Sequence, residues 1–254
     1  MSARPPLRQR IVARDELIGS FVLELPARAA IEAYALAGFD FIVIDLEHSA
    51  TDLGTLSTLI AAAGAVDLPC LVRIEAGATS AITRILDMGP AGIMVPGVRL
   101  AGEAADIVSA ARYHPLGHRG LAPIVRHELQ GAIDAREAMT TVVVQLESAD
   151  VLSEAGAVAA TNGVDVVFVG PYDLSQSVGR PGELDHPEVM AAGLRVAEHV
   201  APHAALGVYL ERPEQIVKWR DAGATFFTAR TDGRIFLDAC CRTLRELRNP
   251  GSTG

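Results

Sequence analysis

The amino-acid sequence predicts an α/β protein folded as a (β/α)8 barrel. Eight short apolar runs rich in Val and Ile alternate with Ala-rich helical segments along its 254 residues. Such runs, ending at Gly, Pro or a polar residue, are typical of buried parallel strands. Eight strand–helix pairs in about 250 residues match a closed barrel, and a doubly wound open sheet is the alternative. No low-complexity linker divides the chain, so we expect residues 1–254 to form one domain.

The elements follow one another in a regular order. The expected strands are 17–23, 40–45, 69–74, 91–95, 141–147, 164–169, 205–210 and 225–229. The expected helices are 27–37, 52–65, 79–88, 101–112, 149–160, 187–200, 213–222 and 232–247. Helix start signals stand at Pro26, at Thr51 or Asp52, and at Pro213. The connections 113–140 and 171–186 are long for this fold, and long ordered loops are usually functional.

Composition excludes several classes of protein. The net charge of −9 argues against a nucleic-acid partner. The sequence has no run of 18 apolar residues, so no membrane span is predicted, and the N-terminus lacks the apolar core of a signal peptide. The three cysteines, Cys70, Cys240 and Cys241, have no zinc-binding spacing. Unpaired thiols fit a reducing compartment, so we expect a cytoplasmic protein.

Two carboxylates stand at the ends of predicted strands. Glu147 closes the strand that begins at Thr141, and Asp173 follows the strand that ends in Val169-Gly-Pro171. Residues just past the carboxyl ends of barrel strands point into the active-site mouth. Hard divalent cations such as Mg²⁺ take oxygen ligands, usually one or two carboxylates plus substrate and water. The matched positions therefore predict a metal site, although either carboxylate could instead cap the following helix.

Other polar residues reach the same edge of the barrel. His48 ends the second strand and carries Asp45 and Glu47 beside it, neighbours that favour the charged imidazole and can orient the ring. We expect His48 to be the base, with Asp45 and Glu47 as supporting residues. Arg73 ends the third strand, where it could clamp a carboxylate or stabilise an enolate, or could pair with Glu75.

Three further residues complete the predicted substrate site. Gln145 lies two residues before Glu147 and so shares its strand face. Gly170 and Pro171 leave room for backbone to approach a small ligand.

Imine chemistry needs a lysine in a desolvated pocket, and the one lysine, Lys218, is predicted on a solvated helix. Metal-assisted chemistry is therefore favoured.

With these residues identified, the chain resembles the HpcH/HpaI family of pyruvate-dependent class II aldolases, relatives of the citrate lyase β subunit and of 2,4-dihydroxyhept-2-ene-1,7-dioate aldolase. The resemblance covers residues from about 15 to 245. It is carried by Phe39-Asp-Phe-Ile-Val-Ile-Asp-Leu-Glu-His48, Leu71-Val-Arg73, Ile85-Leu-Asp-Met-Gly89 with Val95-Pro96, Arg119-Gly120, Gln145-Leu-Glu147 and Val169-Gly-Pro-Tyr-Asp-Leu-Ser175.

The resemblance implies a fold, a reaction and an assembly. The fold is a (β/α)8 TIM barrel whose C-terminal helix is exchanged between subunits of a homo-oligomer, commonly a hexamer built as a trimer of dimers. The reaction is aldol cleavage of a 4-hydroxy-2-oxo acid to pyruvate and an aldehyde, through a metal-stabilised enolate. Glu147 and Asp173 would bind Mg²⁺, Mn²⁺ or Co²⁺, Arg73 would stabilise the enolate, and His48 would act as base. Asp87, which ends a helix on the opposite face, would support His48 from a neighbouring subunit.

The sequence departs from this family at three places. His114 and His118 stand where Pro and an apolar residue are expected, Tyr172 replaces a common Ala, and the sequence Ala229-Arg-Thr-Asp232 replaces a smaller segment. These departures leave the metal site intact and leave the aldehyde open. Two rival functions remain, an acyl-CoA lyase of the citryl-CoA or malyl-CoA type and a non-catalytic barrel that binds small molecules.

Overall fold

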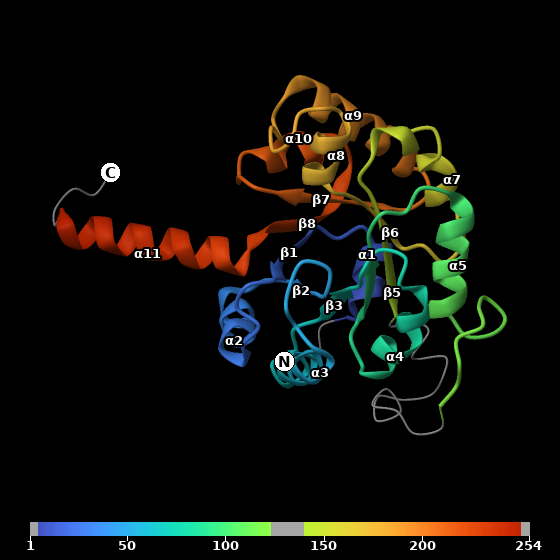
Figure 1. Cartoon of the computed structure of the whole chain (residues 1–254), viewed down its shortest axis with the longest axis horizontal. Coiled ribbons are helices and arrows are strands. Elements are labelled where there is room, and N and C mark those ends of the chain that lie inside the picture. Colours follow the sequence, from blue (N-terminus) through green and yellow to red (C-terminus); the bar gives the residue numbers. More distant parts are fainter. Residues whose placement is uncertain (1–4, 123–139, 250–254) are drawn as a thin grey trace.

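The computed structural model describes residues 5–122 and 140–249, and its strands form a closed parallel barrel (Figure 1). The strands are β1 (Leu17–Val22), β2 (Phe41–Asp45), β3 (Cys70–Arg73), β4 (Gly92–Val95), β5 (Thr141–Leu146), β6 (Val166–Val169), β7 (Ala205–Leu210) and β8 (Ala224–Thr231). Each strand pairs with the next in the chain, and β8 returns to β1 with Leu17 opposite Phe226. The predicted barrel is confirmed, and the open sheet is excluded.

Helices cover the outside of this barrel. They are α2 (Arg28–Ala37), α3 (Leu53–Ala65), α4 (Ile82–Asp87), α5 (Ala101–Ala111), α7 (Ala155–Ala159), α8 (Pro171–Ser177), α9 (Pro187–Val200) and α10 (Gln215–Asp221). The last helix, α11 (Asp232–Arg248), does not join this layer. Short 3-10 turns precede α4 and α7, at Thr79–Ala81 and Ala149–Val151. The start signal at Asp52 is confirmed, because its carboxylate accepts a hydrogen bond from the Thr55 N–H at 2.8 Å.

Three local expectations need correction. The segment 171–186, expected as a loop, begins with α8, because Pro171 fits the first helical position, where its missing N–H costs nothing. The helix expected at 149–160 is broken into a 3-10 turn and the short α7. The N-terminal helix α1 (Leu7–Val12) was not expected at all. Of the long connection 113–140, residues 123–139 lie outside the described part of the chain.

Helix α1 closes one end of the barrel. Leu7 and Ile11 join the apolar cluster inside the barrel, and Arg8 forms an ion pair of 2.8 Å with Asp165, the residue before β6. The interior is filled by Leu17, Phe21, Phe41, Val43, Leu71, Met94, Val143, Val166, Phe168, Ala205 and Phe226. The end where the strands begin is therefore plugged, and a cavity opens at the carboxyl ends of the strands.

Helix α11 extends away from the barrel as a free-standing rod (Figure 1). Its large apolar side chains are exposed: 59% for Phe236, 52% for Leu237 and 74% for Leu247. A single helix carrying such a stripe ordinarily packs it against another surface. None of the described helices is both long enough and apolar enough to cross a membrane.

Candidate active site

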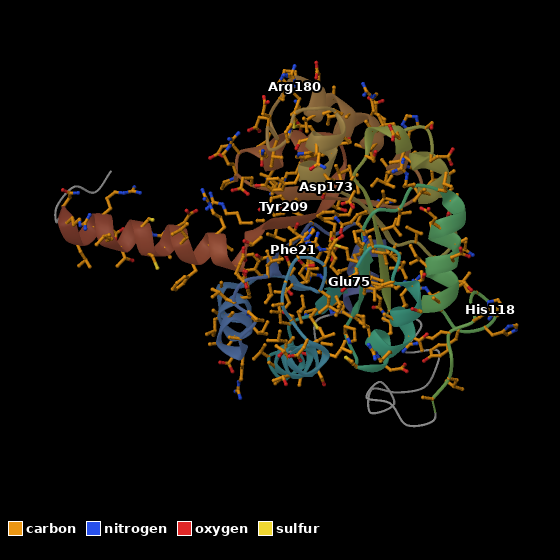
Figure 2. All side chains as sticks on the ribbon, in the orientation of Figure 1. Phe21, Glu75, His118, Asp173, Arg180 and Tyr209 are labelled. Carbon is orange, nitrogen blue, oxygen red and sulfur yellow. The ribbon has the colours of Figure 1, made fainter. Side chains whose placement is uncertain are left out.

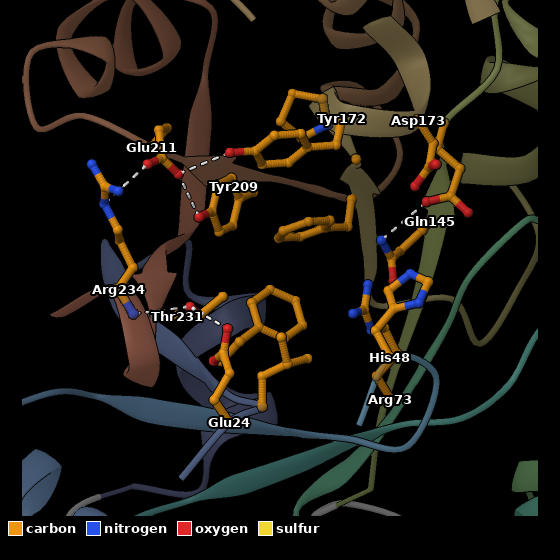
Figure 3. A pocket seen from close by; sticks show the side chains of 16 residues that line it. Glu24, His48, Arg73, Gln145, Tyr172, Asp173, Tyr209, Glu211, Thr231 and Arg234 are labelled. Carbon is orange, nitrogen blue, oxygen red and sulfur yellow. Dashed lines mark hydrogen bonds and ion pairs between the residues drawn. The ribbon is translucent and has the colours of Figure 1, made fainter. Parts of the chain in front are cut away.

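A cavity of about 460 Å³ opens at the carboxyl ends of the strands. Sixteen residues line it, and most of them fall into two groups that face each other across the opening (Figure 3). One group contains the residues predicted from the sequence, namely His48, Arg73, Gln145, Glu147, Gly170, Pro171 and Asp173. The other contains Glu24, Tyr172, Tyr209, Glu211, Thr231 and Arg234. The structure thus brings seven predicted site residues into one cavity.

Glu147 is the most strongly perturbed carboxylate of the first group. Its Oε1 accepts a hydrogen bond from the Gly97 N–H at 2.7 Å, and its Oε2 accepts one from Gln145 Nε2 at 3.3 Å. Burial, together with the negative charges of Asp173 and Glu47, raises the pKa of Glu147 to about 7. Acidic side chains therefore crowd this wall, and a bound cation would relieve their repulsion.

Gly170 leaves the space that Glu147 occupies. A Cβ at position 170 would lie 2.7 Å from Glu147 Oε2, closer than a real contact allows. The next residue, Pro171, begins α8, and that helix carries Asp173 in its first turn. From the sequence, Gly170 is expected to admit a ligand, whereas its close neighbour in the structure is the Glu147 side chain. Gly170 and Pro171 nevertheless both line the cavity.

Arg73 is fixed by a buried carboxylate. Its Nε and NH2 donate to the two oxygens of Asp45, each at 2.7 Å, and Asp45 is fully buried. Asp45 also accepts hydrogen bonds from the N–H groups of Glu47 and His48, at 3.0 and 3.2 Å. One carboxylate therefore holds Arg73 at the end of β3 and the segment that follows β2. Burial alone would lower the pKa of Arg73, but the hydrogen bonds and charge of Asp45 outweigh it and raise the pKa. Asp45 thus takes the place beside Arg73 that Glu75 could have taken.

His48 lies on the open side of the same wall. Its side chain is 60% exposed, and its Nε2 lies 3.7 Å from Glu47 Oε2. Glu47 also lies 3.4 Å from Arg73 NH1. Burial raises the pKa of Glu47, and the charges of Arg73 and His48 partly offset this effect. Glu47 therefore links the histidine to the arginine, and the imidazole remains open to the cavity.

Asp87 lies elsewhere in the subunit. It ends α4, before β4 begins, and does not line the cavity. Its Oδ1 accepts a hydrogen bond from NH2 of the buried Arg119 at 2.6 Å. This agrees with the expectation that Asp87 is remote from His48 within one subunit.

His118, part of the unusual tract noted in the sequence, lies at the outer edge of the molecule, well away from Asp173 (Figure 2).

Sequence reasoning missed most of the second group. Tyr209 is in β7 and Glu211 directly follows it, while Thr231 ends β8 and Glu24 comes shortly after β1. These are strand-end positions of the same kind that identified Glu147 and Asp173, so the strand-end rule could have found them. Arg234 could not be found in this way, because it lies in the first turn of α11.

The first group has the chemistry of a site for a hard cation. Glu147 and Asp173 are oxygen donors on the same wall of the cavity, and the buried Oε1 of Gln145 has no hydrogen-bond partner in the described structure. Among residues 5–122 and 140–249, no three His, Cys, Asp or Glu side chains group to hold a metal ion. The carboxylates of Glu147 and Asp173 fit a cation held by two carboxylates, with substrate and water completing its shell.

Fold and cavity together define a barrel enzyme with an acidic site at its strand ends. The HpcH/HpaI aldolase/citrate lyase family matches residues 19–239 of this chain. A hydroxypyruvate/pyruvate aldolase of Paraburkholderia phytofirmans is 35% identical over 255 residues, covering 96% of this chain and 98% of that protein. A 5-keto-4-deoxy-D-glucarate aldolase of Shigella boydii is 34% identical over 217 residues, covering 82% and 83% respectively.

A solved structure agrees with these matches. An HpcH/HpaI aldolase/citrate lyase family protein of Burkholderia cenocepacia has a TM-score of 0.88 and 33% identity, over 96% of this chain and 99% of that chain. The chain belongs to the HpcH/HpaI aldolase/citrate lyase family. It is a carbon–carbon lyase of the aldolase class, as its aldolase relatives indicate.

Proposed function

We propose that this enzyme cleaves a 4-hydroxy-2-oxo acid to pyruvate, or a close 2-oxo acid, and an aldehyde, and also runs the reverse aldol addition. The observation that carries the proposal is one cavity wall that combines the carboxylates Glu147 and Asp173, the clamped Arg73 and the open His48. The names of the relatives support a pyruvate-like product, since they are called hydroxypyruvate/pyruvate aldolase and 5-keto-4-deoxy-D-glucarate aldolase.

Glu147 and Asp173 would hold the divalent cation, for which Mg²⁺, Mn²⁺ and Co²⁺ are the candidates. When bound, such a cation polarises a carbonyl oxygen and lowers the cost of forming an enolate by several kcal/mol, on the order of other metal-ion catalysis. Gln145 Oε1 offers a further acceptor beside Glu147, which a substrate or water proton can satisfy.

Arg73 supplies fixed positive charge to the substrate. Two of its nitrogens are held by Asp45, so the guanidinium cannot swing away when substrate enters. A charge held in place before the reaction stabilises developing negative charge without reorganisation. Arg73 is therefore assigned to the carboxylate of the 2-oxo acid and to the oxygen that becomes negative.

His48 moves the proton. In the cleavage direction it accepts the proton of the 4-hydroxyl group. In the aldol-addition direction it donates a proton to the new alkoxide. Its exposed ring can exchange that proton with solvent, and Glu47 Oε2 lies 3.7 Å from its Nε2. The base thus lies on the same wall as the groups that bind the oxo acid.

Pyruvate release tests the proposal. Purified enzyme with a 4-hydroxy-2-oxo acid should release pyruvate, EDTA should stop the release, and Mg²⁺, Mn²⁺ or Co²⁺ should restore it. An acyl-CoA lyase would instead act on a malyl- or citryl-CoA ester in a parallel assay, and a non-catalytic barrel would act on neither. Release that EDTA leaves unchanged would contradict the metal-dependent reaction.

A further inference from the structure

The last helix of this barrel does not pack on the outside of the strands. In a (β/α)8 barrel the helices ordinarily form an outer ring around the strands, whereas α11 extends away from the barrel (Figure 1). No loop separates α11 from the strand before it, because β8 ends at Thr231 and α11 begins at Asp232. The backbone at this junction therefore determines the direction in which the helix points.

Arg230, next to the last residue of β8, has a backbone conformation that L-amino acids with a side chain rarely adopt. Its φ of 57° lies in the left-handed region. Its carbonyl oxygen accepts a hydrogen bond from Ser20 Oγ at 3.1 Å, and its Nε donates to the carbonyl oxygen of Glu211 at 3.0 Å. Its NH1 pairs with Asp238 of α11. Strain of this kind persists where surrounding contacts over-determine it, and these contacts come from β1, from the end of β7 and from α11.

Asp232, the first residue of α11, ties the helix to the segment that follows β1. It is 4% exposed, and its carboxylate accepts hydrogen bonds of 2.8 to 3.1 Å from the backbone N–H groups of Leu23, Glu24, Leu25 and Gly233. Hydrogen bonds to a charged acceptor are stronger than those between neutral groups. Three of these donors belong to the barrel, so α11 cannot turn about its first residue without breaking bonds to a buried charge.

We propose that Arg230 and Asp232 form a rigid junction that holds α11 away from its own barrel, so that the junction, and not a partner subunit, sets the direction of the helix. A residue that only connected two elements would relax to an ordinary backbone conformation, and Arg230 does not. The exposed apolar side chains of α11 are thereby presented to a second copy of the chain in one orientation, which lowers the cost of ordering the helix on assembly. This role is independent of the proposed reaction.

Freeing the backbone at the junction tests the effect on assembly. Arg230→Gly tolerates a positive φ and removes the side-chain contacts to Glu211 and Asp238, so the junction becomes flexible. In a dilution series followed by light scattering, we expect half-assembly to move to at least about tenfold higher protein concentration, because the helix must then be ordered on binding. Asp67→Gly is the matched control, since Asp67 has a φ of 58° in an exposed turn between α3 and β3. It should assemble as wild type does, and equal midpoints for the two glycine variants would overturn the proposal.

A second readout follows the direction of α11 without a partner. The variant Leu237→Asp/Leu244→Asp carries charge on the exposed face of α11, so the helix has no apolar face to bind another copy. Spin labels on Cys241 and on Leu36→Cys in α2, both exposed, report the distance between helix and barrel. Cys240→Ser removes the neighbouring exposed thiol.

The width of this distance distribution decides the question. With the junction intact we expect one narrow distribution, and adding Arg230→Gly or Asp232→Asn should broaden it while the circular dichroism spectrum stays unchanged. Asp232→Asn keeps the size of the side chain and removes its charge, so it tests the anchor even if Arg230→Gly does not fold. A broad distribution with the junction intact, or a narrow one in the folded junction variants, would show that the partner sets the direction and would overturn the proposal.

Discussion

At the scale of single residues, Glu147 and Asp173 are the proposed metal ligands. The double variant Glu147→Gln/Asp173→Asn keeps the size of both side chains and removes both negative charges. We expect the purified variant to lose bound divalent metal and aldolase activity together, because neutral amides are poor ligands for hard cations. Metal analysis after dialysis measures the first effect. Undiminished metal content in the double variant would place the cation elsewhere.

His48 carries the proton transfer in this account. His48→Ala should lower kcat by about 10²–10⁴, the usual contribution of a general acid–base group. Binding of pyruvate should change little, since Arg73 is in β3, Glu147 directly follows β5 and Asp173 is in α8. A turnover number near that of wild type would assign the base to another group.

Gly170 tests how tightly the site is built. Gly170→Ala would place a methyl group 2.7 Å from Glu147 Oε2 and push that carboxylate from its position. We expect weaker Mn²⁺ binding by calorimetry with an unchanged circular dichroism spectrum. Gly102→Ala is the control, because a Cβ there meets nothing within 4 Å. Equal metal affinity in both variants would show that the position of Glu147 is not set by Gly170.

At the scale of elements, most strands and helices could be predicted and the exceptions have local causes. Every residue of Thr141–Leu146 is buried and most are apolar, which is typical of strands covered by helices outside and a filled core inside. Helix α1 was missed because it has few apolar residues. Leu7 and Ile11 can be recognised as core residues only once the barrel interior that they fill is known. Helix α8 was missed because a short polar segment after Pro171 has little periodicity of its own.

Helix α11 is predicted to bind another subunit through its exposed stripe. Leu237, Leu244 and Leu247 share one face, and all three are exposed in the single chain. Leu237→Asp/Leu244→Asp should lower the mass measured by light scattering, because a charged helix face no longer packs on an apolar partner. Arg242→Asp, on the opposite face, should leave the mass unchanged. A stripe variant with unaltered mass would contradict helix exchange.

At the scale of the whole molecule, the sequence predicted one wall of the cavity and not the other. Glu147, Asp173, Arg73 and His48 were found because each ends or closely follows an obvious strand. Tyr172 was noticed only as a departure, since its link to Tyr209 and Glu211 exists only once β6 and β7 are adjacent in the closed barrel. Hydrogen-bond networks between strands depend on register, which no single segment reveals.

Asp87 makes a prediction about assembly. It does not line the cavity of its own subunit, so support for His48 would have to come from a neighbouring copy. Asp87→Asn and His48→Ala should each reduce activity, and mixed subunits should recover part of it through hybrid sites. Light scattering should give a mass well above the 26.8 kDa of one chain, with a hexamer expected. A fully active monomer would refute the shared site.

The most direct test of the central claim is exchange of the pyruvate methyl protons in D2O, followed by NMR. The claim is that Glu147 and Asp173 hold a cation that makes pyruvate acidic at its methyl group. Metal-free wild-type enzyme should show no exchange above background, and added Mn²⁺ or Mg²⁺ should start it. The Glu147→Gln/Asp173→Asn variant should stay silent at the same metal concentrations. Equal exchange rates in wild type and variant, or exchange by the metal-free enzyme, would contradict the account.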